Sequence, residues 1–146
     1  MTTYNQYSHI NIKESIRNDW DYILDLRNET REFYNNTNII TKEEHYEYMS
    51  NTSVIFWIVY YNNERVGFLK LNNSDLAIVL DKKIRGKGFG KYILKLGIIK
   101  SDRNLTAMIK KDNIPSLKLY KSLGYFEVRR DGKIIYFKRD HSSEGK

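Results

Sequence analysis

A basic, glycine-rich turn divides the sequence between an apolar segment and an amphipathic one. The turn comprises Arg85, Gly86, Lys87, Gly88, Phe89, Gly90 and Lys91. Residues 75–80 before it are apolar and partly β-branched, which predicts a strand, and residues 89–101 after it carry one apolar face, which predicts a helix. Where a strand leads through glycines into a helix, backbone N–H groups converge and the helix dipole favours an anion. We therefore expect this turn to hold a phosphate group, with its arginine and lysines contacting the oxygens.

The turn does not match two common phosphate-binding motifs, the P-loop and the dinucleotide fingerprint. A P-loop needs Ser or Thr after its lysine, whereas Tyr92 follows Lys91. The dinucleotide fingerprint needs a third glycine three residues after Gly88, where Lys91 stands. A plain glycine-rich turn on a basic surface remains the alternative.

The order of the other periodic segments predicts an α/β fold. Helices are expected over residues 19–33, 42–49, 89–101 and 114–123, and strands over residues 54–60, 66–71, 75–80, 105–109, 125–128 and 134–137. Thr41 and Glu44 form a capping box for the second helix, and Asn113 caps the fourth. The strand–helix–strand unit over residues 75–109 predicts a crossover that makes two strands parallel.

Length and composition limit the number of domains and argue against metal sites and membrane segments. With 146 residues the chain is short for two typical domains, so we expect one domain over residues 1–140 and a disordered polar tail over residues 141–146. The sequence has no cysteine, and His9, His45 and His141 lack ligand spacing, so no metal site is expected. No apolar run is long enough for a membrane span or a signal peptide, so we expect a cytoplasmic protein without a membrane partner.

Two separated motifs resemble those of the GNAT N-acetyltransferase superfamily. Its pyrophosphate motif, Arg/Gln-x-x-Gly-x-Gly/Ala, is matched by Arg85, Gly88 and Gly90. Residues 113–125 are similar to the family's Asn-x-x-Ser/Ala-x-x-x-Tyr-x-x-x-Gly-Phe/Tyr segment, and they follow in the right order. One departure is Lys82, where many relatives carry proline. The resemblance implies a GNAT-like single α/β domain, with a mixed central sheet of about six to seven strands flanked by about four helices.

The same resemblance implies acetyl-CoA as the cosubstrate and assigns its contacts. The expected cofactor-binding residues are the seven residues of the turn together with Val79, Leu80, Asn113, Ser116 and Tyr120. Backbone groups of Val79 and Leu80 would pair with the pantetheine arm. Tyr120 would protonate the departing thiolate as a general acid, with a core tyrosine as the alternative. Asp75 stands where many relatives carry the glutamate that acts as general base, with a turn residue as the alternative.

The expected acceptor is a primary amine of a small molecule. The front of the chain, residues 26–45, resembles a subgroup that includes nucleotide-amino-sugar N-acetyltransferases of pseudaminic-acid-type biosynthesis. The substrate-binding residues expected on that resemblance are Arg27, Asn28, Arg31 and His45. The two arginines lie one helical turn apart and could hold a carboxylate or a diphosphate, or else they form a solvated helix face. The same pattern also resembles acetyltransferases of ribosomal proteins and antibiotics, so a protein N-terminus or an antibiotic amine is the alternative acceptor.

Two functions without catalysis stay open from the residues alone. A net charge of +7 with many aromatic residues suits a nucleic-acid-binding module. No basic cluster alternates with aromatics along one strand, so nucleic acid is not the expected partner. A GNAT-like fold that binds CoA as a regulatory ligand would show binding without turnover. By family analogy, a homodimer through the terminal strands is the expected assembly.

Overall fold

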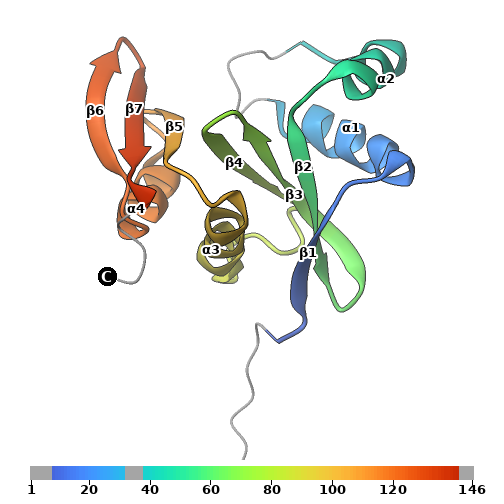
Figure 1. The fold of residues 1–146 in the computed structure, drawn as a ribbon, viewed down its shortest axis with the longest axis horizontal. Helices are drawn as coiled ribbons and strands as arrows, with labels where there is room; N and C mark the ends of the chain where they lie inside the picture. The colour runs from blue at the N-terminus through green and yellow to red at the C-terminus, as the bar shows by residue number, and fades with distance from the viewer. Residues whose placement is uncertain (1–7, 32–37, 142–146) are drawn as a thin grey trace, which may run out of the picture.

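Residues 8–31 and 38–141, which the computed structural model describes, contain one mixed sheet with helices on both of its faces (Figure 1). Its strands are β1 (Ile10–Glu14), β2 (Ile55–Tyr61), β3 (Glu64–Asn72), β4 (Asp75–Leu80), β5 (Leu105–Lys110), β6 (Phe126–Asp131) and β7 (Ile134–Arg139). The α-helices are α1 (Trp20–Glu29), α2 (Lys42–Asn51), α3 (Phe89–Ser101) and α4 (Ile114–Ser122), and a short 3-10 helix, η1 (Arg17–Asp19), precedes α1. Within these residues, the expected α/β class with its mixed sheet and four α-helices is confirmed.

The strand order β1-β2-β3-β4-β5-β7-β6 places β4 at the centre of the sheet. Strands β1 to β4 form an antiparallel meander, and the crossover through α3 makes β4 and β5 parallel, as the sequence predicts. Strand β1 was not predicted. Its five residues, from Ile10 to Glu14, alternate too briefly to give a strong signal, and pairing with β2 holds them extended, with Ile10 opposite Tyr61.

Local capping explains where α2, α3 and α4 begin. The Thr41 hydroxyl accepts a hydrogen bond from the Glu44 N–H at 3.2 Å, and the Glu44 carboxylate accepts one from the Thr41 N–H at 3.1 Å, which confirms the predicted capping box. The Asn113 side chain accepts from the Ser116 N–H at 3.3 Å, so the predicted cap of α4 is also confirmed. Helix α3 begins after Gly88, whose φ of 83° is left-handed and suits glycine.

The first helix and the last hairpin end at other residues than predicted. The first helix was expected over residues 19–33, but α1 ends at Glu29. There the hydroxyl of Thr30 donates back to the carbonyl of Leu26 at 2.8 Å, and residues 32–37 lie outside the described residues. The last hairpin is longer than predicted, since β6 extends to Asp131 and β7 to Arg139.

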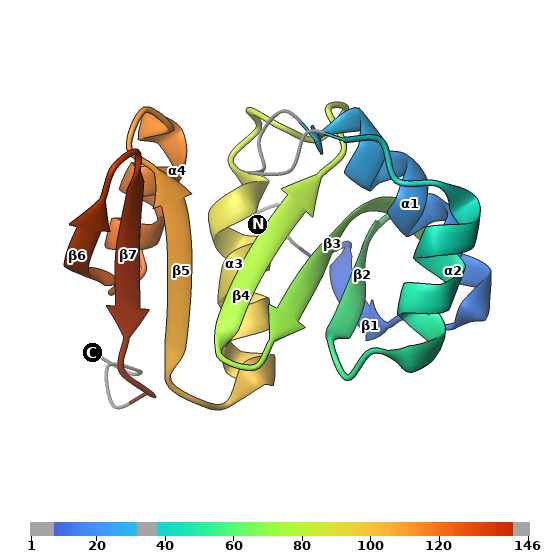
Figure 2. The same ribbon diagram turned by 90° about the horizontal axis from the view of Figure 1, so that it is seen from above.

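The alternation of side chains along β2 builds two hydrophobic cores on opposite faces of the sheet. Phe56 and Ile58 pack with Ile23 of α1, whereas Trp57 and Val59 belong to a larger core that includes residues of α3 and α4. Figures 1 and 2 show α1 and α2 together over one part of the sheet and α3 behind its middle. The face carrying α1 is therefore distinct from the face carrying α3 and α4.

The parallel strands β4 and β5 separate soon after they meet. Their register contains one paired position, Asp75 with Thr106, and Figure 2 shows the two strands diverging toward their carboxyl ends. The Thr106 N–H donates to the carbonyl of Ser74 at 2.7 Å beside this position. Beyond this position, the described residues of β4 and β5 form no further pair.

The end of the described chain is tied to the loop before β5. The His141 N–H donates to Asn104 Oδ1 at 2.7 Å, and its Nε2 lies 3.1 Å from a carboxylate oxygen of Asp102. Residues 142–146 of the expected disordered tail lie outside the described residues. None of the helices in residues 8–31 and 38–141 is long and apolar enough to cross a lipid bilayer.

Candidate functional site

A cavity of about 430 Å³ lies on the α1 face of the sheet, across β3, β4 and β5. This volume falls in the range of ligand pockets, roughly 300 to 1,000 Å³. Tyr120 and Leu76 belong to the other core, yet they also line the cavity, where β4 and β5 diverge. Of the residues expected from sequence, the cavity brings together Arg27, Arg31, Asp75, Val79, Asn113, Ser116 and Tyr120. Asn28, His45, Leu80 and the glycine-rich turn are not part of its described lining.

Tyr120 of α4 lies at the separation of β4 and β5. It is 6% exposed, and its hydroxyl donates a 3.3 Å hydrogen bond to the carbonyl of Leu76 in β4. The ring of Tyr125 packs edge-on against it, with 4.9 Å between the ring centroids. The Tyr120 ring therefore belongs to the core and the residue also lines the cavity, and its role as general acid stays a prediction.

Asp75 is the first residue of β4 and lies on the same wall of the cavity as Lys70. In the β3–β4 register, Asp75 pairs with Asn72 and Lys70 pairs with Ala77, so their side chains share one face of the sheet and are diagonal neighbours. Burial raises the pKa of the Asp75 carboxyl, and the nearby Lys70 ammonium opposes that rise. A carboxylate whose pKa is raised accepts a proton from an amine more readily than an exposed one.

The glycine-rich turn follows β4 and presents its backbone outward. Gly86 and Gly88 have φ angles of 75° and 83°, and a Cβ built on either would meet no atom within 4 Å. The turn is anchored from beneath by Ile84 and Phe89, which are 3% and 6% exposed. The Phe89 ring packs against Tyr61, with 5.2 Å between centroids, so its side chain belongs to the core. Open space lies in front of both left-handed glycines, beside the first turn of α3, where a helix binds anions.

The second half of β4 is held closely to β3 and diverges from β5. Val79 and Leu80 pair with Phe68 and Gly67 on the β3 side. A Cβ on Gly67 would lie 2.5 Å from the carbonyl oxygen of Val79, so only glycine lets β3 approach β4 this closely. Residues 79 and 80 therefore lie in β4 on the side of Gly67, and Val79 also lines the cavity with Tyr120.

The four residues expected to bind the acceptor separate into two pairs. Arg27 and Arg31 line the cavity. Asn28 instead joins α1 to the segment before α2, since its amide donates to the carbonyl of Ile40 at 3.0 Å and accepts from the Ile40 N–H at 2.9 Å. His45 is fully buried. The structure places Asn28 and His45 behind the cavity wall, not on it.

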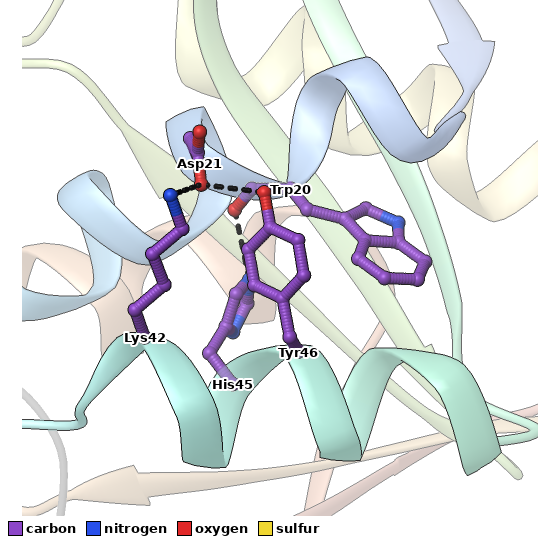
Figure 3. Close-up of polar contacts among 5 residues, drawn as sticks. All are labelled: Trp20, Asp21, Lys42, His45 and Tyr46. Atoms are coloured by element: carbon purple, nitrogen blue, oxygen red, sulfur yellow. Dashed lines mark hydrogen bonds and ion pairs between the residues drawn. The ribbon is translucent and has the colours of Figure 1, made fainter.

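His45 connects α2 to α1 through both ring nitrogens. Its Nε2 lies 2.8 Å from the carbonyl oxygen of Trp20, as Figure 3 shows, and a carbonyl can only accept, so Nε2 donates. The unprotonated Nδ1 then faces the Nη1 group of Arg27 at 3.5 Å. Beside this contact, the Tyr46 hydroxyl donates to Asp21 at 2.7 Å (Figure 3). His45 therefore holds the Arg27 guanidinium that reaches the cavity.

Sequence reasoning missed two basic residues of the cavity, Lys70 and Lys110. Lys70 interrupts the apolar run Gly67-Phe68-Leu69-Lys70-Leu71 in the middle of a strand. A lysine at a half-buried strand position was the available signal, because lysine is rarely buried without a reason. Lys110 ends β5 and gave no comparable signal.

Comparison with known proteins identifies the family. The sequence profile described as "Acetyltransferase (GNAT) family" matches residues 20–125, from the start of α1 to the end of the α4 segment. This chain belongs to the GNAT acetyltransferase family. No curated protein sequence matches it.

Solved structures of GNAT proteins share the fold at low sequence identity. A spermidine N-acetyltransferase from Vibrio cholerae, in complex with CoA and spermine, has a TM-score of 0.80 at 14% identity and covers 92% of this chain and 97% of its own. A putative phosphinothricin N-acetyltransferase has a TM-score of 0.76 at 22% identity, covering 90% and 98%. A ribosomal-protein-alanine N-acetyltransferase from Brucella melitensis has a TM-score of 0.76 at 17% identity, covering 89% and 99%.

GNAT enzymes use acetyl-CoA, and features of this chain fit that cosubstrate. The open space at Gly86 and Gly88 would admit a phosphate close to the backbone. Tyr120 lies where β4 and β5 diverge, and its hydroxyl bonds to the carbonyl of Leu76 in β4. Among the residues that the structure describes, no group of three or more histidine or acidic side chains could hold a metal ion.

Proposed function

We propose that this GNAT enzyme transfers the acetyl group of acetyl-CoA to the primary amine of a small molecule by direct attack of the amine, and that the acceptor is an amino-sugar nucleotide of the pseudaminic-acid type. The catalytic part of this proposal rests on one observation: Asp75 and Tyr120 line the same cavity, where β4 and β5 separate. The residues of the turn 85–91 hold the phosphates of CoA, and Val79 and Leu80 hold its pantetheine arm. We place the reaction in the cytoplasm.

In this proposal Asp75 and Tyr120 move the two protons of the reaction. Acetyl-CoA supplies an acetyl group on a thioester. Asp75 takes one proton from the acceptor ammonium, so that the neutral amine can attack the thioester carbon and form the C–N bond. The C–S bond then breaks, Tyr120 delivers its phenolic proton to the departing sulfur, and the second proton of the nitrogen returns to the Tyr120 oxygen. Asn113 and Ser116, which line the same cavity, contact the cosubstrate at the start of α4.

The choice of acceptor rests on Arg27 and Arg31. Both line the cavity, and each is a guanidinium that can bind a diphosphate in a bidentate manner. Asn28 and His45 support the acceptor site from behind, through the contacts that fix α1 against α2. The homodimer expected from the family would use an edge of the sheet, which in the described residues is β1 or β6.

Calorimetric titration with acetyl-CoA tests the cosubstrate site. The informative variant is Gly88→Glu, and the chain offers a matched control in Gly132→Glu. Both glycines have a positive φ, 83° and 59°, and a Cβ at either meets nothing within 4 Å, so the backbone strain is shared. We expect acetyl-CoA binding by wild type and Gly132→Glu and its loss in Gly88→Glu. No binding by folded wild-type protein would refute the proposal, and equal affinity in both variants would remove the turn from the site.

A screen of amines tests the acceptor. Release of the CoA thiol would be followed with a nucleotide amino sugar, an alanine-starting peptide and an aminoglycoside as acceptors. The proposal requires the highest kcat/KM with the nucleotide amino sugar. A preference for the peptide or the antibiotic would replace it with the corresponding alternative acceptor.

A further inference from the structure

Lys70 occupies an unusual position on the floor of the cavity. It lies in β3 between Leu69 and Leu71, which are buried on the opposite face, and its own side chain shares the face of Phe68. Its partner across the strand pair is Ala77, whose short side chain leaves the space above the sheet open. Lys70 is therefore directed into the cavity by strand alternation, not extended over the protein surface.

The charged groups that act on Lys70 are one cation, Arg27, and one carboxylate, Asp75. Burial lowers the pKa of its ammonium, Arg27 lowers it further, and only Asp75 acts in the opposite direction. Among the described residues, Lys70 forms no ion pair, whereas Arg65 pairs with Asp19 at 3.0 Å elsewhere in the fold. The Lys70 charge is thus held in a partly buried place without a carboxylate in contact.

The described lining of the cavity as a whole carries more positive than negative charge. Its charged members are four cations and one carboxylate, namely Arg27, Arg31, Lys70, Lys110 and Asp75. Arg27 contacts the neutral imidazole of His45, and Arg31 donates to the carbonyl of Asn28 at 2.7 Å, so neither of these bonds supplies negative charge. Of the four cations, Arg31 is exposed and the other three are half-buried. A half-buried charge without an opposite charge in contact is costly, and a ligand that brings the opposite charge reduces that cost.

We infer that the acceptor carries an anionic group, a phosphate or a carboxylate, which binds between Lys70 and Arg27 while its amine faces Asp75. This inference rests on the proposed function and names the class of acceptor. Lys70 then acts as a specificity-determining residue: it attracts amines that bear an anion and repels polyamines. The cavity is opposite in charge to what a polycation such as spermidine requires, although the fold is shared with a spermidine acetyltransferase.

The first experiment measures anion binding without any turnover. Inorganic pyrophosphate would be titrated into the protein in the presence of excess CoA, so that the glycine-rich turn cannot account for the signal. The variant Lys70→Met removes the charge and keeps the length of the side chain. Its matched control is Lys138→Met, an exposed lysine of β7 that does not line the described cavity.

We expect pyrophosphate to bind about tenfold more weakly to Lys70→Met, since a hydrogen bond between charged groups contributes on that order. Lys138→Met should match wild type. No binding of pyrophosphate by wild type, or affinities for the two variants within about twofold of each other, would overturn the inference. Thermal unfolding of each variant verifies that both remain folded.

The second experiment compares amine acceptors with and without a phosphate group. Ethanolamine and O-phosphoethanolamine form such a pair, and spermidine is the polycation. We expect the phosphate to raise kcat/KM by about tenfold in wild type and to lose that advantage in Lys70→Met. Faster acetylation of spermidine than of O-phosphoethanolamine would overturn the inference. Failure to bind acetyl-CoA or to acetylate any amine would refute the proposed function instead. The pyrophosphate titration would still test whether Lys70 binds an anion, because it needs no turnover.

Discussion

The Nδ1 atom of His45 lies 3.5 Å from the Nη1 atom of Arg27, so a fully buried imidazole holds a guanidinium that reaches the cavity. The contact requires neutral His45, because a protonated ring has no lone pair to offer and would repel Arg27. Burial lowers the pKa of His45 below its ordinary 6.5; Arg27 lowers it further, whereas the Trp20 carbonyl and Asp21 raise it.

Folding stability should therefore decline on acidification through His45. The lowered pKa means that the unfolded chain takes up the proton first, below pH 6.5, and the stabilisation is lost as pH falls through the folded pKa. Thermal unfolding of wild type and His45→Gln, from about pH 5 to about pH 8, measures this. Wild type should lose stability more steeply than the variant toward low pH. Parallel curves would show that His45 does not change protonation on unfolding.

Replacement of Tyr120 by Phe should slow catalysis much more than it weakens binding. The variant keeps the ring against Tyr125 and removes the hydroxyl that bonds to Leu76. We expect kcat to fall by about 10²- to 10⁴-fold, as for loss of a general acid, with little change in the Kd of acetyl-CoA. Stability should fall by about 1 kcal/mol from the lost hydrogen bond. An unchanged kcat would leave Tyr120 as a core residue only.

Asp75→Asn should inactivate the enzyme without destabilising it at neutral pH. Burial raises the pKa of this carboxyl in the folded protein above 3.8. Protonation of Asp75 therefore stabilises the fold below that pH, and this contribution is lost as pH rises through the folded pKa. A neutral amide avoids the cost of burying the charge. Steady-state kinetics and thermal melts at about pH 8 give the two readouts. Retained activity would remove Asp75 from the role of base.

Gly67→Ala should affect acetyl-CoA binding through the backbone of β4. The new Cβ would lie 2.5 Å from the carbonyl oxygen of Val79, and such overpacking costs about 1 to 3 kcal/mol. Gly97→Ala provides the control, because the atoms nearest its Cβ would be the ends of the Leu69 and Leu76 side chains, at 3.0 Å and 3.2 Å, and not the backbone of β4. Both variants should melt earlier, and only Gly67→Ala should bind acetyl-CoA more weakly. Equal binding by both would separate residues 79 and 80 from the cosubstrate.

Features that depend on neighbours in the chain were predictable from the sequence. The capping box at Thr41 and the cap at Asn113 formed as expected, because each needs only residues three positions apart. Helix α3 has the predicted bounds, since its apolar face begins directly after the glycine-rich turn. Strand β4 and the parallel pairing of β4 with β5 were also expected from the order of the segments.

Features that depend on distant pairing were not predictable. Strand β1 exists because β2 offers it a free edge. The side of the sheet that Lys70 faces follows from the register of β3 with β4, which no local pattern determines. Asn28 and His45 were assigned to the acceptor by resemblance, and only the packing of α1 against α2 shows that their polar atoms are used between these elements.

The single paired position between β4 and β5 also has a mechanical consequence. The sheet consists of two parts, β1-β2-β3-β4 and β5-β7-β6, which pair only at Asp75 and Thr106 in the described residues. The rest of the boundary between β4 and β5 has no strand pairing. In the proposed binding mode, the pantetheine arm lies between β4 and β5 and forms hydrogen bonds with backbone groups of β4 that do not pair with β5. Amide protons of β4 should then exchange more slowly in the complex. The donor would make the molecule rigid before the acceptor arrives.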